Sequence, residues 1–375
     1  MKLKLTLIAL LVIGLPVSVF GDKTRKAKAH LEKVEQSIEA DSSVTVSVCV
    51  SGSVTVRGWN NNQVLARAAD AKRIELQRND GAAQRGPARK IDVVVVDGEE
   101  SGDGCDAFSD VELSVPRGAS VHVQTRDGDI SIADVAEAYA VSQNGNIDIQ
   151  NASRSAEVCS VSGSVVLKDS VGRANLTSVG GSIQAANVRP ASPSDSLEAV
   201  TVSGDIDLIH VEHSQLNART VNGNVNLTGP LSRGGRYEFK TMSGDVTLAM
   251  PDDASFQINA KVSQSGEIIT DFPLQLTPEP AQAPKATKAP TPVAAVATPL
   301  APAPPEAAQP GPPPDAPLTP SPTPAQVIRV IPKVKVVTVD HSFYKLRKFT
   351  ASHGTGDAVI YVASFSGTLH LKRSE

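Results

Sequence analysis

Hydroxyl side chains recur at a fixed position of a short phrase that the sequence repeats. The phrase places Ser or Thr three residues before a glycine, and its eight regular copies carry Thr125, Ser142, Ser160, Ser178, Thr201, Thr220, Thr241 and Ser263. One activated hydroxyl could act as a nucleophile or contact a ligand. A hydroxyl that returns in every copy is more typical of a stacked fold, in which small polar side chains satisfy nearby backbone groups. We therefore interpret this row as structural.

Carboxylates recur beside the same glycines, at Asp129, Asp205 and Asp245. A polysaccharide lyase or hydrolase on a parallel β-helix would need carboxylates clustered in a cleft, usually two at a set separation. Successive glycines are only 17 to 23 residues apart, which leaves little chain for loops that could form a cleft. The three aspartates repeat as turn residues do. The sequence thus predicts no catalytic residue and no enzyme.

Two groups have the residue types of a metal site. His210 and His213 form the close histidine pair of the chain, but no clear third ligand accompanies them as zinc would require. The acidic loop 97–110 is rich in oxygen ligands, yet its spacing does not match the helix-loop-helix calcium pattern. We interpret the loop as solvated and predict no metal and no cofactor.

The chain has three cysteines, Cys49, Cys105 and Cys159. Their spacing matches neither a zinc ribbon nor a redox CxxC motif. If the protein is exported, one disulfide is permissible, and three single pairings are open. Cys49 stands three residues before Gly52 in an earlier copy of the phrase, where the other copies have Ser or Thr. It is therefore expected to be a small buried residue.

The repeated phrase also predicts the elements that position these side chains. Its glycines are Gly128, Gly145, Gly163, Gly181, Gly204, Gly223, Gly244 and Gly266. Ile or Val stands two residues after each glycine, and the alternation on both sides is the period of a β-strand. The glycine would supply the positive φ of a tight corner. Because one copy cannot bury its own apolar face, the copies must stack. We predict an all-β fold, a single-stranded parallel β-helix or β-solenoid with coils of about 20 residues.

The amino-acid composition of the chain agrees with the narrow core of a solenoid. Aromatic residues make up only 3% of the 375 residues, whereas a compact sandwich or barrel usually has more aromatic volume. The net charge is −4 and the pI about 6.0. There is no basic stripe with interleaved aromatics, so neither nucleic acid nor an anionic membrane is expected as a partner.

The N-terminus has the pattern of a secretory signal. Lys2 and Lys4 precede an apolar run at 5–20, and Val19-Phe20-Gly21 offers small residues for cleavage. The run is short for a membrane span, so cleavage after Gly21 is favoured over an uncleaved anchor. No membrane span is expected after removal of the signal.

We predict four parts of the chain. They are a signal peptide (1–21), a β-solenoid (22–276, irregular at about 40–115 and regular at about 116–276), a Pro/Ala-rich disordered segment (277–326) and terminal strands that close the solenoid (327–375). Of the 47 residues from 278 to 324, 17 are proline, which favours an extended tether or spacer. The phrase returns after this segment, with Ser364 three residues before Gly367. The proline-rich tract is therefore interpreted as an insertion within the solenoid.

Three stretches carry a resemblance to a known family. They are GSVTVRGWNNNQV (52–64), the serial SGDIDL-type phrases up to Gly266, and GTGDAVIYVASFSGTLHLK (354–372). Together they resemble a bacterial candidate-adhesin family of unknown function, whose members look like secreted β-solenoids. The resemblance implies a role in the bacterial envelope and offers no functional residues to transfer. The long proline-rich segment departs from the usual pattern of the family.

These observations favour a non-catalytic exported protein of the cell envelope, with adhesin-like binding or scaffolding through the solenoid. Its partner would be an unknown protein or glycan of the envelope or surface, met in the periplasm or at the cell surface. A regular face suits a repetitive ligand such as a glycan or another sheet edge. The alternatives are an envelope-stress sensor or partner-recruiting module and, less favoured, a polysaccharide-active β-helix enzyme.

Overall fold

The computed structural model describes residues 34–69, 71–81, 86–96, 105–263, 266–276 and 347–374. The predicted signal peptide, the predicted proline-rich segment and residues 327–346 of the predicted terminal strands lie outside these ranges. The described residues form 26 β-strands in one compact unit, and they contain no helix that could cross a membrane. The predicted all-β solenoid is confirmed.

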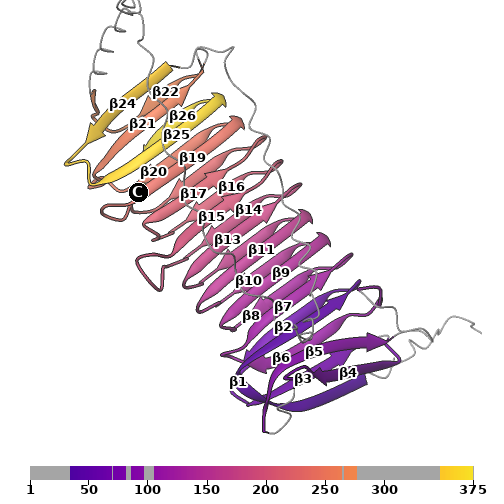
Figure 1. Cartoon of the computed structure of the whole chain (residues 1–375). Coiled ribbons are helices and arrows are strands. Elements are labelled where there is room, and N and C mark those ends of the chain that lie inside the picture. Colours follow the sequence, from indigo (N-terminus) through magenta and orange to yellow (C-terminus); the bar gives the residue numbers. More distant parts are fainter. Residues whose placement is uncertain are drawn as a thin grey trace, which may run out of the picture. The chain divides into compact units, whose positions relative to one another are not determined.

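Each regular coil contributes one strand to each of two faces, in which most strands run parallel (Figure 1). Face B contains, in spatial order, β4 (Arg73–Arg78), β5 (Ala88–Val96), β1 (Val34–Val50), β7 (Ser120–Thr125), β9 (Glu137–Asn144), β11 (Ser155–Ser162), β13 (Arg173–Ser178), β15 (Ser196–Val200), β17 (Gln215–Arg219), β19 (Arg236–Ser243), β25 (Ala358–Ser366), β21 (Phe256–Val262), β24 (Arg347–His353) and β23 (Gln275–Leu276). Face A contains β3 (Gln63–Ala68), β6 (Val111–Pro116), β2 (Val54–Trp59), β8 (Ile130–Ala133), β10 (Ile147–Gln150), β12 (Val165–Lys168), β14 (Ile183–Ala186), β16 (Ile206–Ile209), β18 (Val225–Thr228), β20 (Val246–Met250), β26 (Leu369–Arg373) and β22 (Ile268–Thr270).

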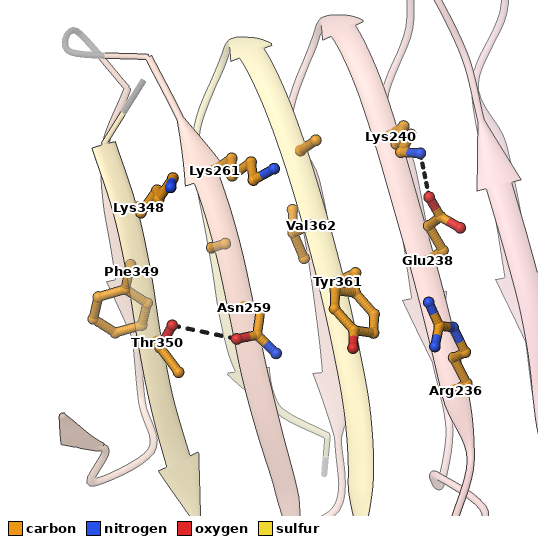
Figure 2. A pocket seen from close by; sticks show the side chains of 12 residues that line it. Arg236, Glu238, Lys240, Asn259, Lys261, Lys348, Phe349, Thr350, Tyr361 and Val362 are labelled. Carbon is orange, nitrogen blue, oxygen red and sulfur yellow. Dashed lines mark hydrogen bonds and ion pairs between the residues drawn. The ribbon is translucent and has the colours of Figure 1, made fainter. Parts of the chain in front are cut away.

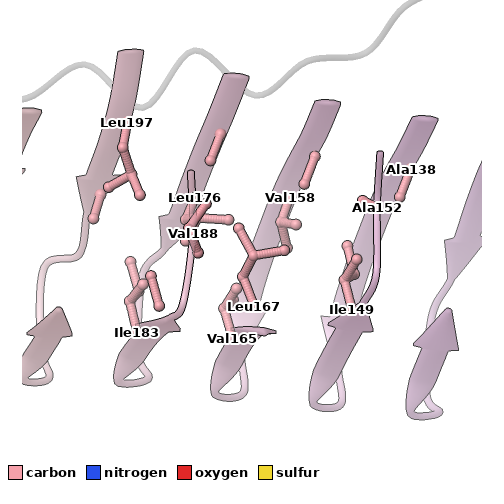
Figure 3. Close-up of a cluster of buried hydrophobic side chains, with 14 of the residues drawn as sticks. Ala138, Ile149, Ala152, Val158, Val165, Leu167, Leu176, Ile183, Val188 and Leu197 are labelled. Atoms are coloured by element: carbon pink, nitrogen blue, oxygen red, sulfur yellow. The ribbon is translucent and has the colours of Figure 1, made fainter. Parts of the chain in front are cut away.

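The inward side chains of the two faces form continuous apolar rows (Figure 3). Val165 and Ile183 are paired neighbours on face A, and both are 0% exposed. Val158 and Leu176 are paired neighbours on face B and are also buried. Each fully buried Val, Leu or Ile side chain stabilises the fold by about 1.5–3 kcal/mol. The Ile/Val position of the phrase therefore lies in the core in seven of the eight copies, as predicted, whereas Ile268 in the last copy is only partly buried.

The glycine of the phrase is required by the close approach of successive coils. A Cβ atom on Gly163 would lie 2.1 Å from the carbonyl oxygen of Gly145, and one on Gly145 would lie 2.1 Å from that of Gly128. The prediction that the glycine supplies a positive φ applies only to some copies, such as Gly244 with φ 142°. In the whole row of corner glycines, the shared reason for glycine is the close packing of the backbone against the next coil. A single copy of the phrase cannot reveal this packing.

The order of the coils in space differs from their order in the sequence at both ends. The second half of β1 lies between β5 and β7, although both follow it in the chain. At the other end, β25 lies between β19 and β21, and β26 lies between β20 and β22 (Figure 1). The antiparallel strand β24 then pairs with β21. The C-terminal coil is thus enclosed by earlier coils, and β24 lies beyond them.

Candidate functional site

The hydroxyl row has the structural role predicted for it. Thr201 Oγ1 donates a hydrogen bond to Gly181 O at 2.9 Å, and Thr220 Oγ1 donates to Gly204 O at 3.0 Å. Ser364 in the C-terminal coil makes the same bond, to Gly244 O at 3.3 Å. Because these hydroxyls are buried and bonded between coils, they hold the corners together. Ser263 is not part of the row, since Val262 occupies the position that faces Ser364.

The corner aspartates also bond to the neighbouring coil. Asp129 Oδ1 accepts a hydrogen bond from the backbone N–H of Asn146 at 2.7 Å. Asp205 Oδ1 accepts one from Asn224 at 2.7 Å, and Asp245 Oδ1 accepts one from Thr368 at 2.6 Å. Each of these carboxylates therefore satisfies a backbone donor at a corner, as a turn residue does.

The histidine pair does not converge on one site. His210 is exposed and lies in the left-handed region, with φ 50°. His213 is 0% exposed, and its Nε2 lies 2.8 Å from Gly172 O, whereas its buried Nδ1 has no partner among the described residues. Burial lowers the pKa of the His213 imidazole. Within the described ranges, no group of three or more His, Cys, Asp or Glu side chains could hold a metal ion.

Part of the acidic loop predicted at 97–110 lies outside the described residues, which resume at Cys105. In the described part, Asp110 Oδ1 accepts the backbone N–H of Ser53 at 2.9 Å, and Asp106 forms an ion pair with Arg126 at 2.9 Å. Both carboxylates are thus already bonded to other residues of the chain.

Cys49 forms a disulfide with Cys105, and Cys159 is free. The expectation that Cys49 is a buried member of the hydroxyl row is wrong. Val50 faces Thr125 across the ladder, so the first copy is offset by one residue and Cys49 is turned to the outer face. Burial raises the pKa of the half-buried Cys159 thiol.

A groove lies on the outer surface of face B, where β19, β25, β21 and β24 run side by side (Figure 2). It has a volume of about 380 Å³. Four cationic side chains line it, and we call it the cationic groove. They are Arg236, Lys240, Lys261 and Lys348.

One half of the cationic groove is a compact set of polar contacts. The guanidinium carbon of Arg236 lies 4.7 Å from the centroid of the Tyr361 ring. Glu238 forms ion pairs with Lys240 and, at 3.6 Å, with Arg219. The hydrogen bond from Lys240 holds the pKa of the Glu238 carboxyl below its usual value. Glu238, the carboxylate in the groove lining, is therefore already engaged by cations.

The other half brings like charges together. Lys261 on β21 and Lys348 on β24 are directly opposite each other in an antiparallel pair. Like charges in this position destabilise a sheet. Among the described residues, no carboxylate lies within ion-pair distance of Lys261. Thr350 Oγ1 donates to Asn259 Oδ1 at 3.2 Å between the same two strands. The described lining of the groove thus has more cations than carboxylates, beside hydrogen-bonding side chains.

Sequence analysis missed the cationic groove because its residues are far apart in the chain. One signal was present, since aligning the phrase on Gly244 and Gly367 places Glu238 and Tyr361 at the same position of their coils. The pairing of these two residues agrees with that alignment. The alignment does not tell which coil the C-terminal one contacts, and that contact decides which side chains meet.

The model of the Toastrack DUF4097 family matches residues 37–290. Among solved structures, a candidate adhesin from Parabacteroides merdae is similar, with 9% identity and a TM-score of 0.39, covering 58% of this chain and 89% of that chain. A candidate adhesin from Parabacteroides distasonis has 12% identity and a TM-score of 0.37, covering 59% and 90%. No curated protein matches the sequence.

Proposed function

Because the chain belongs to the Toastrack DUF4097 family, we propose that it is a non-catalytic, adhesin-like protein of the cell envelope that binds its partner through the cationic groove. The observation that carries this proposal is the convergence of four cationic side chains on one groove, where no carboxylate of the described residues lies within ion-pair distance of Lys261. A surface whose described lining has more cations than carboxylates is suited to a partner that supplies negative charge.

The hydroxyl and carboxylate side chains elsewhere in the solenoid favour a binding function over a catalytic one. The hydroxyl row and the corner aspartates are hydrogen-bonded to the backbone of the next coil. An activated nucleophile needs an adjacent base instead, and a glycosidase needs two convergent carboxylates. A rigid sheet face, in contrast, is well suited to holding binding groups in fixed positions.

The location that we propose is the periplasm or the cell surface. The signal pattern at 1–21 supports export, and the Cys49–Cys105 disulfide suits an oxidising compartment. We also propose that residues 277–326 form a tether inserted into the solenoid, and that the chain after it returns to complete the stack. The placement of β24, β25 and β26 beside β19 to β22 supports that return.

The proposed function is tested by co-sedimentation of the purified full chain with washed cell envelopes. We expect the wild type to sediment with the envelopes and the Lys261→Glu/Lys348→Glu variant to stay in solution. Lys168→Glu/Lys372→Glu makes the same charge change on face A and serves as the matched control. Failure of the wild type to sediment, or equal sedimentation of all three proteins, would contradict the proposal.

Protease treatment of intact cells tests the location. Digestion in intact cells is the result for a surface protein, and digestion only after the outer layer is opened is the result for a periplasmic one. Recovery of the chain in the cytosol would overturn the proposed export.

A further inference from the structure

We propose that the N-terminal end of the solenoid binds a neutral carbohydrate, in a second site that is separate from the cationic groove. A polar cleft of about 730 Å³ lies beside the loop 60–62, which joins β2 to β3. The strands β1, β2 and β3 lie at the opposite end of the stack from β24 (Figure 1). The volume is typical of a small-molecule site, which has about 300–1,000 Å³. We call it the asparagine cleft.

The three consecutive asparagines of the loop, Asn60, Asn61 and Asn62, have no structural use for their side chains. Most other described asparagines have one. The amide of Asn224 accepts a backbone N–H of the next coil at 2.9 Å, and Asn187 occupies the left-handed region with φ 56°. None of the three loop residues has a positive φ, and none of their exposed amides bonds to a described residue. These amides are therefore available to a ligand.

Glu39 and Gln63 add two more available polar groups to the asparagine cleft. They face each other across the antiparallel pair of β1 and β3, and both are exposed. Neither side chain forms a hydrogen bond or an ion pair with a described residue. An amide both donates and accepts hydrogen bonds, and a carboxylate accepts them. Because a hydroxyl group also donates and accepts, this set of side chains matches the hydroxyls of a sugar.

Backbone hydrogen bonds hold these side chains in fixed positions. Trp59 Nε1 donates to Gln63 O at 2.8 Å across the loop, and the N–H of Ala40 donates to Asn62 O at 3.0 Å. The N–H of Arg117 donates to Trp59 O at 3.1 Å where the loop begins. A ligand would thus meet a preformed set of groups, which lowers the entropy cost of binding.

The lining of the asparagine cleft disfavours acidic and apolar ligands. Among the described residues that line it are two carboxylates, Glu39 and Asp41, and no cation. Asp41 Oδ1 already accepts the N–H and the hydroxyl of Ser43, each at 3.0 Å. An acidic ligand would be repelled by the two charges. Ala40 and Pro87 are the apolar residues of the lining, which is less apolar surface than a lipid or drug-like ligand requires.

A peptide is disfavoured because the cleft offers little open backbone. Peptides commonly join a sheet by pairing with an edge strand. The first part of β1 (34–39) is such an edge, since β3 is the described strand that pairs with it, but it contributes only Glu39 to the lining. Ala40 is bonded to Asn62 and pairs with Ala88. One open residue is too short for an added strand.

The expected affinity is low. An open site that makes a few hydrogen bonds to hydroxyl groups should have a dissociation constant on the order of 1 mM. Binding this weak would not hold the chain on envelopes by itself, so sedimentation still reports on the cationic groove. The two sites can therefore fail independently.

Saturation-transfer difference NMR of the full chain tests the proposal, because it detects weak binding. The neutral probes are cellotetraose, maltotetraose and N-acetylated chitotetraose, and the comparison probes are tetragalacturonate and a neutral glycine–serine tetrapeptide. We expect transfer to a neutral oligosaccharide and little transfer to the comparison probes. Asn60→Ala/Asn62→Ala should weaken binding about tenfold, and Glu39→Gln should weaken it less. Asn175→Ala, which removes an amide without a side-chain bond on face B, is the matched control.

Melting curves show whether each variant is folded, and Glu39→Gln decides if the double variant is not. Absence of transfer to all three neutral oligosaccharides would overturn the proposal. Equal affinity of the wild type and the folded variants would overturn the assignment of the site. Stronger transfer to tetragalacturonate or to the tetrapeptide would identify an acidic or a peptide ligand instead, and the ligand class would be wrong.

Discussion

Arg236 on β19 lies over the ring of Tyr361 on β25, with 4.7 Å between the guanidinium carbon and the ring centroid. The two residues meet because the C-terminal coil lies between β19 and β21, where the sequence order would place β21 directly after β19. The same insertion brings Lys261 next to β25, and β24 then adds Lys348. The cationic groove is therefore a product of the coil order at this end of the solenoid.

A methyl group on a corner glycine should destabilise the stack. In Gly163→Ala the new Cβ would lie 2.1 Å from Gly145 O, so the coils must separate locally. We expect a loss of about 1–3 kcal/mol in the free energy of unfolding, measured by urea denaturation. Gly180→Ala is the control, because its Cβ would meet no atom closer than 3.4 Å. Equal stability of the two variants would show that the close approach is not what requires the glycine.

Removing one hydroxyl of the buried row should cost stability and leave binding unchanged. Thr201→Val keeps the shape of the side chain but removes the hydrogen bond to Gly181 O. The expected loss is about 1 kcal/mol, since the partly buried carbonyl oxygen of Gly181 loses its donor. Thr177→Val, on the outer surface of face B, should change stability by less than about 0.5 kcal/mol. Loss of envelope binding in folded Thr201→Val would contradict a purely structural role.

Acid should weaken the fold through His213. Its pKa in the folded state is lowered by burial, an effect that its contact with Gly172 O and the carboxylates of Asp195 and Glu212 oppose. As pH falls through the ordinary histidine value of about 6.5, the unfolded state takes up the proton first. The stabilising effect of a neutral His213 is thus complete above that pH and is lost as pH falls toward the folded-state pKa.

The measurement is the free energy of unfolding at about pH 7.5 and at about pH 5.5. Wild type should lose more stability on acidification than His213→Gln, by at most about 1.4 kcal/mol per pH unit. His210→Asn is the control, because His210 is exposed and Asn tolerates its positive φ. If the wild type and His213→Gln have the same pH dependence, His213 does not titrate as its burial requires.

Breaking the disulfide should loosen the N-terminal end of the solenoid. Cys49 and Cys105 are 56 residues apart in the chain, and their bond joins β1 to the segment that leads into β6. We expect Cys49→Ser/Cys105→Ser to lose about 2–4 kcal/mol, with a lower melting temperature than the oxidised wild type. Cys159→Ser should keep the wild-type response to a reducing agent. An unchanged melting temperature after reduction would argue against the bond.

The repeat itself made much of the fold predictable. A glycine followed at two residues by Ile or Val fixes a corner and an inward side chain, and stacking of such copies can bury their faces only in a solenoid. The row that contains Thr201 and Ser364 followed from the same logic. In each case the prediction depended on a position within one coil and not on which coil lies next to it.

The remaining features depend on contacts between coils that are alike. Copies of one phrase form coils with nearly the same hydrogen-bonding edges. The sequence pattern is therefore as compatible with pairing of β25 with β19 as with pairing of β25 with β21 alone. The offset of the first copy is a similar case, since a shift of one residue exchanges the two faces of a strand and turns Cys49 outward. Both features decide what the surface displays, so the cationic groove could not be predicted from the sequence.

Lysine footprinting of the full chain tests the central claim most directly. Acetylation rates would be measured for each lysine with and without an excess of washed cell envelopes, so that Lys168 and Lys372 on face A serve as controls in the same sample. Binding in the cationic groove predicts slower acetylation of Lys240, Lys261 and Lys348 and unchanged rates at the two controls. Protection of Lys168 or Lys372, or equal rates at all five lysines under conditions of binding, would contradict the assignment of this surface.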